Sequence, residues 1–577
     1  MSAPVATDLR SGPSDRPLRE QDELSCGDSA GPQPRARFAP SFHEPLTSRH
    51  VLALTAILAV ASTLRLSYLL MARGTPGFIW ADPDGYTRKA MQLAHGGDGW
   101  RWTFEAVRYT IDGRDHVLPP LYSVFLSGFA LYPNFPFTAQ IAQIVLATAA
   151  CALMFNLGRV VHSPAAGLMA AAGYAVWIPN ILNVWSTSQE ALYGPLILLA
   201  FTLLARAMIA DAGRLQFGLA GISFGFAALT RSMPLFFVMP AALAHLALAP
   251  ERRVAGRQIA ALLLGFALVT LPYSVALSRH FGRITLIDTH GSIHFTASPG
   301  GAAGPPGVFE TAEAMWQSFA AAEPTRYLAE SASRARSLLQ LNGGRLLQIY
   351  VVAATRATAL AWKVGVHLGA DALLIASVVL APVGAAVCRN TRPALMFLLW
   401  AVVNVGVASL GGFGGARLRT PFEPLLLVLA AVVVAGGWRL PARAWLAAGI
   451  ALGLMMSAVV LPQVPESLRA QPDYGIDWGS PLMRHTGRMK GTAGFSVPAY
   501  GGIAEFTVTP VTAQPTESQR IDVRIGGSPA RRLLVAGGEE RMLRYVWPAR
   551  GLAFVEVDAN EPTRGDPAEL RVTIGAR

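Results

Sequence analysis

The sequence predicts a polytopic α-helical membrane protein of about 11 to 13 transmembrane helices, followed by a small C-terminal β-sandwich-like domain outside the membrane. Of its 577 residues, 52% are apolar and only 15% are charged, whereas soluble chains average about 25% charged residues. The apolar residues gather into runs close to the roughly 20 residues that a spanning helix needs. Near the C-terminus, apolar and polar residues instead alternate, as in half-buried strands.

Residues 1–48 are predicted to form a disordered cytoplasmic tail, because they are rich in Pro, Ser, Gly and charge and contain no apolar run. The formal net charge of +12 could indicate a nucleic-acid partner. The first 50 residues, however, hold six arginines against seven carboxylates. The remaining cations lie as short clusters between apolar runs, which is typical of membrane topology. We therefore expect no nucleic-acid partner.

A transmembrane domain is predicted over residues 49–461. Its candidate spans are 51–71, 138–160, 165–182, 186–208, 215–231, 233–249, 257–277, 366–388, 393–411, 420–437 and 442–461. Basic clusters between these runs belong in the cytoplasm by the positive-inside rule. The loops 73–118 and 279–349 and the C-terminal tail then lie on the outer side, provided that the shorter run 119–133 does not cross. This topology gives about 11 crossings.

The C-terminal tail is predicted to comprise a linker, 462–484, and an extracytoplasmic β domain, 485–577. The β domain is predicted from short segments in which apolar and polar residues alternate, separated by Gly, Pro and Asn. These segments are 504–511, 519–525, 531–537, 552–558 and 568–574.

The first outer loop carries two carboxylates, Asp82 and Asp84, just before an amphipathic segment. Helix capping explains one of them but not both. A carboxylate at the lipid–water boundary can take a proton from a hydroxyl, or can hold a divalent cation such as Mg²⁺ or Mn²⁺ against phosphate oxygens. Both acids are therefore candidate catalytic residues. The nearby aromatic residues Tyr86 and Tyr122 suit stacking on a sugar ring or an interfacial belt.

The predicted topology gathers further charges at the outer ends of the helices. They are Glu190, Arg231, Arg417 and Arg419. An arginine beside apolar helices is costly unless it meets an anion or reaches water, and a guanidinium matches phosphate bidentately. We therefore expect the three arginines to bind a phosphate group. For one of them, an ion pair with Glu423 is the alternative.

The second outer loop contains two histidines, His290 and His294, whose spacing could bind a metal on a helix. The intervening Gly291 disfavours a helix there. We therefore predict that His290 lies in a substrate-facing loop and that these two histidines do not form a metal site.

Several motifs together resemble the GT-C glycosyltransferases, in particular bacterial relatives of dolichyl-phosphate-mannose protein mannosyltransferase and of lipid A aminoarabinose transferase. The resemblance covers most of residues 50–437. The motifs, in chain order, are Asp82-Pro83-Asp84-Gly85-Tyr86, Pro119-Pro120-Leu121-Tyr122, Leu157-Gly158-Arg159, Glu190 before a long helix, Gly225–Arg231, and Arg417–Pro424.

The resemblance implies an inverting transfer of a sugar from a polyprenyl-phosphate donor to a hydroxyl of a lipid, polysaccharide or protein acceptor. It implies the outer face of a bacterial inner membrane, with the N-terminus cytoplasmic and the β domain periplasmic or extracellular. The family's base in the first outer loop corresponds most simply to Asp82, although Pro83 separates the two acids and leaves Asp84 open. Leu118 stands where the aminoarabinose transferases have a lysine that contacts lipid phosphate, so this contact would fall to arginines or to His116.

Two alternatives remain at this stage. The first is an oligosaccharyltransferase-like subunit with a lipid-pyrophosphate donor, because Asp82 and Asp84 could form a metal loop and Asp473-Tyr474-Gly475 resembles part of that family's motif. The second is a lipid or sugar transporter, which should place charges near the bilayer midplane. Within the predicted helices such charges are few, Arg65 and Asp371 being exceptions.

Overall fold

The chain divides into residues 1–44 and residues 45–577 in the computed structural model. In the second part, the structure describes residues 46–74, 85–95, 108–111, 114–209, 213–288, 324–339, 341, 360–410, 416–437 and 442–457. It also describes the C-terminal residues 474–477, 486–500, 503–511, 518–525, 531–536, 539–546, 551–559 and 569–574. The predicted tail, 1–48, lies almost entirely outside the described residues.

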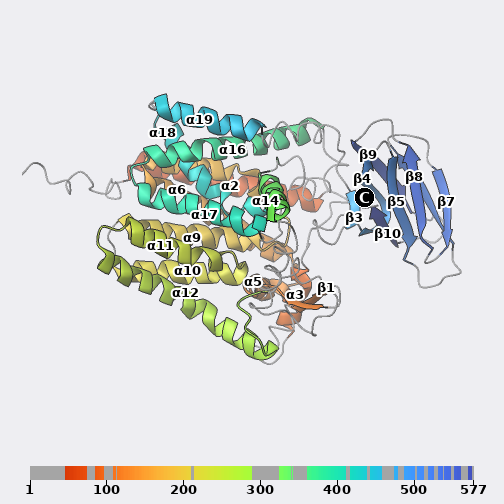
Figure 1. Cartoon of the computed structure of the whole chain (residues 1–577), viewed down its shortest axis with the longest axis horizontal. Coiled ribbons are helices and arrows are strands. Elements are labelled where there is room, and N and C mark those ends of the chain that lie inside the picture. The colour runs from red at the N-terminus through yellow and green to blue at the C-terminus, as the bar shows by residue number, and fades with distance from the viewer. Residues whose placement is uncertain are drawn as a thin grey trace, which may run out of the picture. The chain divides into compact units, whose positions relative to one another are not determined.

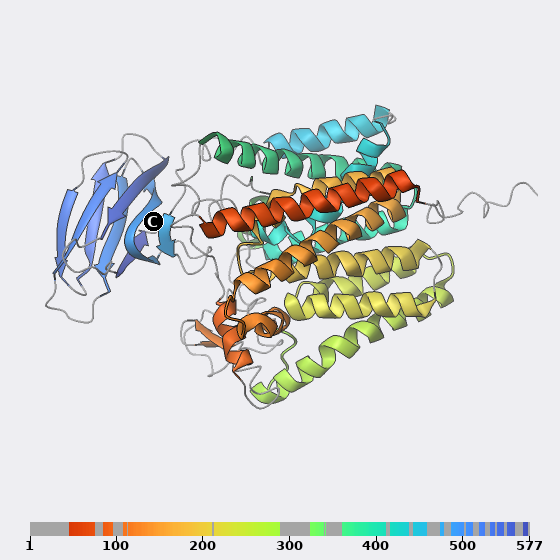
Figure 2. The same cartoon turned by 180° about the vertical axis from the view of Figure 1, so that it is seen from behind.

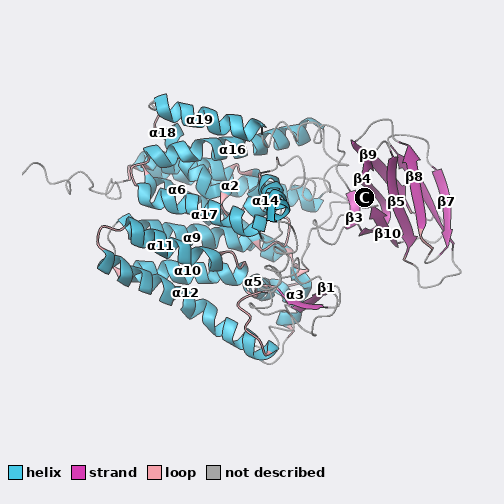
Figure 3. Ribbon diagram, in the orientation of Figure 1, coloured by secondary structure: helices cyan, strands magenta, loops and turns pink. Residues whose placement is uncertain are grey.

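Helices form most of the described chain up to residue 457, as Figures 1 and 3 show. They are α2 (Ser48–Gly74), α3 (Tyr86–Ala94), α5 (Leu121–Ala130), α6 (Phe137–Val161), α7 (Pro164–Ala175), α8 (Ile178–Leu182), α9 (Glu190–Ile209), α10 (Arg214–Thr230), α11 (Pro234–Leu248), α12 (Arg252–Phe281), α14 (Pro324–Leu338), α16 (Leu360–Val387), α17 (Thr391–Leu410), η5 (Ala416–Arg419), α18 (Glu423–Ala435) and α19 (Ala442–Met455). Every predicted span contains a helix, but 165–182 is broken into α7 and α8.

Six described helices are long and apolar enough to cross a membrane, so the chain is an integral membrane protein. They are α2, α6, α9, α12, α17 and the Gly369–Val387 part of α16. The other predicted spans correspond to helices of 12 to 17 residues, α7, α10, α11, α18 and α19. These are shorter than the roughly 20 residues that a full crossing needs, which is why the two counts differ.

Hydrogen bonds between sequence-distant turns show which helix ends lie together. Between α16 and α17, Asn390 donates to the carbonyl oxygens of Val160 at 2.6 Å and Val161 at 3.0 Å, in the last turn of α6. The chain runs back along α7 before α9 begins, and along α17 before α18 begins. The first residues of α9 and of α18 therefore lie at the opposite end of the bundle, which is called the site end below. Figure 2 shows α2 running beside α6.

Helices α10 and α12 approach closely because glycines line their contact. A Cβ atom on Gly221 would lie 2.0 Å from the carbonyl oxygen of Leu262, and one on Gly265 would lie 2.2 Å from that of Gly218. Neither contact is sterically possible, so a side chain at either position would push the helices apart. This packing holds the end of α10 beside the segment that follows α12.

The C-terminal region forms an antiparallel eight-stranded sheet in the order β7-β6-β9-β4-β10-β5-β8, with β3 paired to β4. Its strands are β3 (Tyr474–Asp477), β4 (Thr486–Tyr500), β5 (Ile503–Pro510), β6 (Ser518–Ile525), β7 (Arg531–Ala536), β8 (Arg541–Val546), β9 (Gly551–Asp558) and β10 (Glu569–Ile574). One half of β4 pairs with β10 and the other half with β9, so the strands fold around a shared core.

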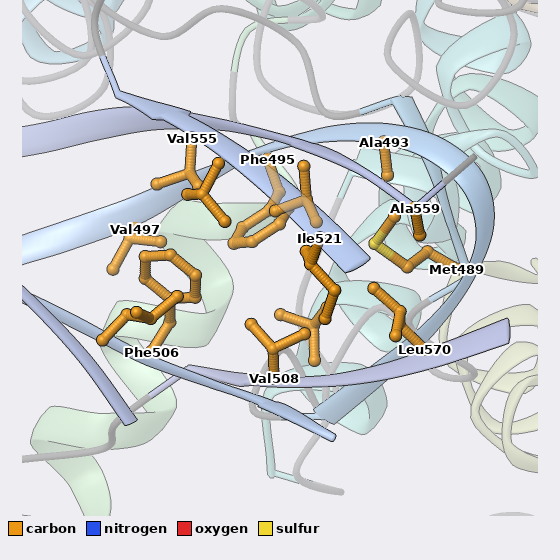
Figure 4. Packing of buried hydrophobic residues seen from close by; sticks show 14 of the residues in the cluster. Met489, Ala493, Phe495, Val497, Phe506, Val508, Ile521, Val555, Ala559 and Leu570 are labelled. Carbon is orange, nitrogen blue, oxygen red and sulfur yellow. The ribbon is translucent and has the colours of Figure 1, made fainter. Parts of the chain in front are cut away.

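Alternate residues of these strands fill that core, as Figure 4 shows. Phe495 and Phe506 meet edge to face, with 5.6 Å between ring centroids. The five predicted strand segments all contain strands, whereas β3, β4 and β8 were not predicted. Strand β3 lies inside the predicted linker 462–484. In β4, glycines and Pro498 interrupt the apolar alternation, so the sequence gives little strand signal there.

Candidate active site

Glu190 and Arg231 form an ion pair at the site end of the bundle. Arg231 Nη1 donates to Glu190 Oε1 at 3.0 Å. Glu190 begins α9, and Arg231 follows the last residue of α10 in an extended conformation. The Glu190 side chain is 2% exposed, whereas the Arg231 side chain is 14% exposed. The structure thus joins two of the predicted site residues and leaves part of the arginine accessible.

The start of α9 stabilises the carboxylate of Glu190. Ser188 donates its hydroxyl hydrogen to Glu190 Oε2, and the positive end of the helix dipole favours a negative charge there. Two other buried hydroxyls, on Thr187 and Tyr193, find no hydrogen-bond partner within the described part of the chain. Buried hydroxyls are ordinarily bonded, so these two are donors that a bound ligand could use.

The first outer loop reaches this ion pair through Tyr86, the first residue of α3. Its hydroxyl donates to Gln189 Oε1 at 2.9 Å, next to Glu190. Its ring meets Tyr122 edge to face, with centroids 4.9 Å apart, and Gln143 Nε2 donates to the Tyr122 hydroxyl at 3.2 Å. Both tyrosines are fully buried. In this structure the two tyrosines pack the loop against the bundle. Their stacking on a sugar stays a prediction.

Lys89 is a buried cation in the same loop that was not predicted from the sequence. It is 3% exposed, and its Nζ lies 5.5 Å from the centroid of the Tyr86 ring. Nζ is also close to Gly85, since a Cβ there would lie 3.6 Å from it. Gly85 has a φ of 64° and directly follows Asp84 in the chain. In the sequence, Lys89 follows Arg88 and resembles an ordinary exposed base, so no pattern distinguishes it.

Asp288 is a second carboxylate beside Arg231, and it was also missed. It follows α12, is half-buried, and accepts a hydrogen bond from the Ser232 hydroxyl. Burial raises the pKa of this carboxyl to about 6, against the opposing effects of Ser232 and Arg231. Its position two residues before His290 was the available signal, because the start of this loop was already predicted to face substrate.

Arg419 and Glu423 form another ion pair at the site end, and this pair is sealed. Arg419 Nε donates to Glu423 Oε2 at 3.0 Å, and the two side chains are 0% and 2% exposed. Trp177 Nε1 donates to Glu423 Oε1 at 2.8 Å. Arg419 Nη1 also donates to the carbonyl oxygen of Leu338, at the end of α14, at 3.3 Å. The alternative left open for one arginine, a pair with Glu423, is therefore present.

For several predicted site residues, the structure does not describe the side chain. Asp82, Asp84 and His290 lie outside the described residues. For Arg417 the structure describes only the backbone, in the short helix η5. His116 lies in the hairpin of β1 (Arg108–Ile111) and β2 (Arg114–Val117), opposite Tyr109.

The described residues contain no group of three or more His, Cys, Asp or Glu side chains that could hold a metal ion. The acids considered for Mg²⁺ or Mn²⁺, Asp82 and Asp84, lie outside that set.

Arg65, the buried charge that a transporter could use, has a structural role instead. Its N–H groups donate to Asn180 and to the carbonyl oxygens of Ala61, Tyr174 and Ala175. These bonds account for all five guanidinium donors.

No family model and no curated protein matches this chain. Among solved structures, it is similar to the archaeal oligosaccharyltransferase AglB from Archaeoglobus fulgidus in complex with an inhibitory peptide and a dolichol-phosphate. The identity is 14% and the TM-score 0.44, with 72% of this chain and 55% of AglB covered. It is also similar to ArnT from Cupriavidus metallidurans bound to undecaprenyl phosphate, with 14% identity, a TM-score of 0.44, and 71% of this chain and 65% of ArnT covered.

Solved GT-C membrane glycosyltransferases are thus among the structures to which this chain is similar. The chain spans less than two thirds of the length of either relative.

Proposed function

We propose that this protein is an inverting membrane glycosyltransferase. It moves a sugar from a polyprenyl-phosphate donor to a hydroxyl of a lipid, polysaccharide or protein acceptor on the outer face of the membrane. The observation that carries the proposal is the Glu190–Arg231 ion pair, whose arginine stays partly accessible at the site end of the bundle. A guanidinium at a membrane boundary suits a lipid-linked phosphate.

Arg231 would hold the leaving phosphate, with Arg417 as a second candidate. Glu190 fixes the guanidinium by accepting from Nη1, and the carboxylate itself is held by Ser188 and by the start of α9. Positioned charges of this kind stabilise a developing negative charge without reorganisation. Arg419 would not contact the phosphate, because it is fully buried in its pair with Glu423. It would instead position η5, which carries Arg417.

The chemical step needs one base. A carboxylate of the first outer loop, Asp82 in the simplest assignment, takes the proton of the acceptor hydroxyl. The acceptor oxygen then attacks the anomeric carbon, the bond from that carbon to the phosphate oxygen breaks, and the polyprenyl phosphate leaves with the electron pair. One displacement inverts the anomeric configuration. The contact of Tyr86 with Gln189 supports this assignment, because it ties the loop that carries Asp82 to the phosphate site.

The experiment compares wild type with Asp82→Asn and Asp84→Asn. Each purified protein is incubated with membrane extract and undecaprenyl-phosphate sugars, and glycosylated products are identified by mass spectrometry. Loss of the general base should slow transfer by about 10²- to 10⁴-fold. Membrane expression should be unchanged. If only Asp84→Asn is inactive, the base moves by two residues. Transfer from pyrophosphate-linked donors alone would favour the oligosaccharyltransferase-like alternative.

A further inference from the structure

The segment that follows α12 is folded back firmly onto the bundle. Gly282 has a φ of 67° and ends the helix, and the Arg283 amide donates to the carbonyl oxygen of Ser278 at 3.2 Å. Ser278 and Thr285 then exchange two hydrogen bonds. The Thr285 amide donates to Ser278 Oγ at 2.9 Å, and that hydroxyl donates to the Thr285 carbonyl oxygen at 2.8 Å. The backbone path after the helix is therefore well defined.

The next residues anchor this segment at the end of α10. Ile287 is fully buried and packs with Ala228 of α10, Tyr273 of α12 and Val117 at the end of the first-loop hairpin. The following residue, Asp288, thereby reaches the Ser232 hydroxyl, which adjoins Arg231 in the chain. The anchored backbone, rather than a chance side-chain contact, places this carboxylate beside the proposed phosphate site.

Within the described residues, two carboxylates act on the Arg231 cation, Glu190 of α9 and Asp288. The hydroxyls of Tyr193 on α9 and Tyr273 on α12 also interact electrostatically with members of this cluster. Glu190 is a bonded partner of the guanidinium, whereas Asp288 is bonded to Ser232. The ionised carboxylate of Asp288 interacts with Arg231 through its charge alone, and it therefore also repels an anion that approaches the guanidinium.

We propose that Asp288 is a specificity-determining residue of this site, which favours a singly charged phosphodiester over a doubly charged pyrophosphate. The proposal rests on the proposed function, and it adds a reason why the donor is a monophosphate. Repulsion between two charges grows in proportion to each charge. The carboxylate of Asp288 therefore penalises a dianion twice as much, in free energy, as it penalises a monoanion.

Protonation of Asp288 should remove the penalty. Because the pKa of Asp288 is raised to about 6, the carboxyl is mostly ionised at pH 7.5 and mostly neutral at pH 5. An anion bound nearby favours the neutral form, so anion binding takes up a proton. The affinity of the site for anions should therefore rise as the pH falls through about 6, and it should rise more for a dianion than for a monoanion.

The test measures binding of two short probes to the full chain in detergent. Farnesyl methyl phosphate carries one negative charge and farnesyl methyl pyrophosphate carries two, and neither charge changes between pH 5 and pH 8. Wild type is compared with Asp288→Asn, which keeps the shape of the side chain. Glu251→Gln is the matched control, because it removes the same charge at the opposite end of α12.

At pH 7.5, Asp288→Asn should bind the phosphodiester about threefold and the pyrophosphate about tenfold more tightly than wild type. Lowering the pH to 5 should produce the same gains in wild type and in Glu251→Gln, but not in Asp288→Asn. The inference is overturned if Asp288→Asn keeps the wild-type preference and pH dependence, or if it loses affinity for both probes. If wild type binds neither probe at either pH, the proposed function itself fails.

Discussion

Two arginine–glutamate ion pairs lie at the same end of the helical bundle, and they differ in their surroundings. Arg231 pairs with Glu190 across two helices and is 14% exposed. Arg419 pairs with Glu423 four residues along the chain and is fully buried. Two hydroxyls near the first pair lack partners among the described residues. Every other contact described for the second pair, to Trp177 and to Leu338, is made within the protein.

The difference shows what each pair can do. A buried ion pair whose other contacts come from the same chain is suited to holding elements together, here α14, η5 and the segment between α7 and α8. A pair with an accessible guanidinium and unused donors nearby is suited to a ligand. The sequence presents Arg231 and Arg419 alike, as arginines at outer turns next to apolar helices. Only their burial separates a site residue from a structural one.

The largest expected effect is on folding. Arg419→Gln leaves Glu423 buried without its cation, which costs about 3–5 kcal/mol. We expect a large loss of monodisperse protein on size-exclusion chromatography in detergent. Arg231→Gln should keep the wild-type elution profile, because the Arg231 side chain is 14% exposed and water can take its place beside Glu190. Equal losses in the two variants would remove the distinction between the pairs.

Replacing both members of each pair sharpens the comparison. Arg419→Met with Glu423→Gln removes both buried charges, while the new amide oxygen still accepts from Trp177. This double variant should recover most of the stability that Arg419→Gln loses, since paired removal avoids an unpaired buried charge. Arg231→Met with Glu190→Gln should fold but stay inactive. Thermal melting and a transfer assay measure the two effects, and recovery of activity in the second double variant would contradict the account.

The smallest expected effect concerns Trp177. Trp177→Phe removes the hydrogen bond to Glu423 Oε1 and keeps most of the ring packing. The loss should cost about 1–3 kcal/mol, because a buried acceptor loses one of its donors. A modest fall in melting temperature with unchanged transfer is expected. A strong loss of transfer at unchanged stability would instead place the sealed pair in the active site.

Most of the helical fold was predictable, because a spanning helix must be apolar along its length and the runs are long. Every predicted span contains a helix. The number of full crossings was less predictable, because an apolar run can be divided into two short helices. The run 165–182 is divided in this way into α7 and α8, and Arg65 binds at the division. Its guanidinium binds the carbonyl oxygens of Tyr174 and Ala175 at the end of α7. Long-range capping of this kind leaves no local pattern.

The site was predictable only in part. Glu190 and Arg231 follow from topology alone, because charges at outer turns are few. The roles of Asp288 and Lys89 do not follow from the predicted topology. Asp288 depends on a backbone that folds back through Ser278 and Thr285, and burial of Lys89 depends on how α3 packs. The closeness of Asp288 to His290 in the sequence indicates only the loop to which it belongs, and the placement of both side chains is a tertiary effect.

The most direct test of the central claim is release of undecaprenyl phosphate from undecaprenyl-phosphate sugars, with wild type beside Arg231→Gln. If Arg231 holds the leaving phosphate, wild type releases the lipid from at least one donor. The variant should then be about 10²- to 10³-fold slower at an unchanged melting temperature. Release at equal rates from both proteins would contradict the claim and move the phosphate site away from the Glu190–Arg231 pair.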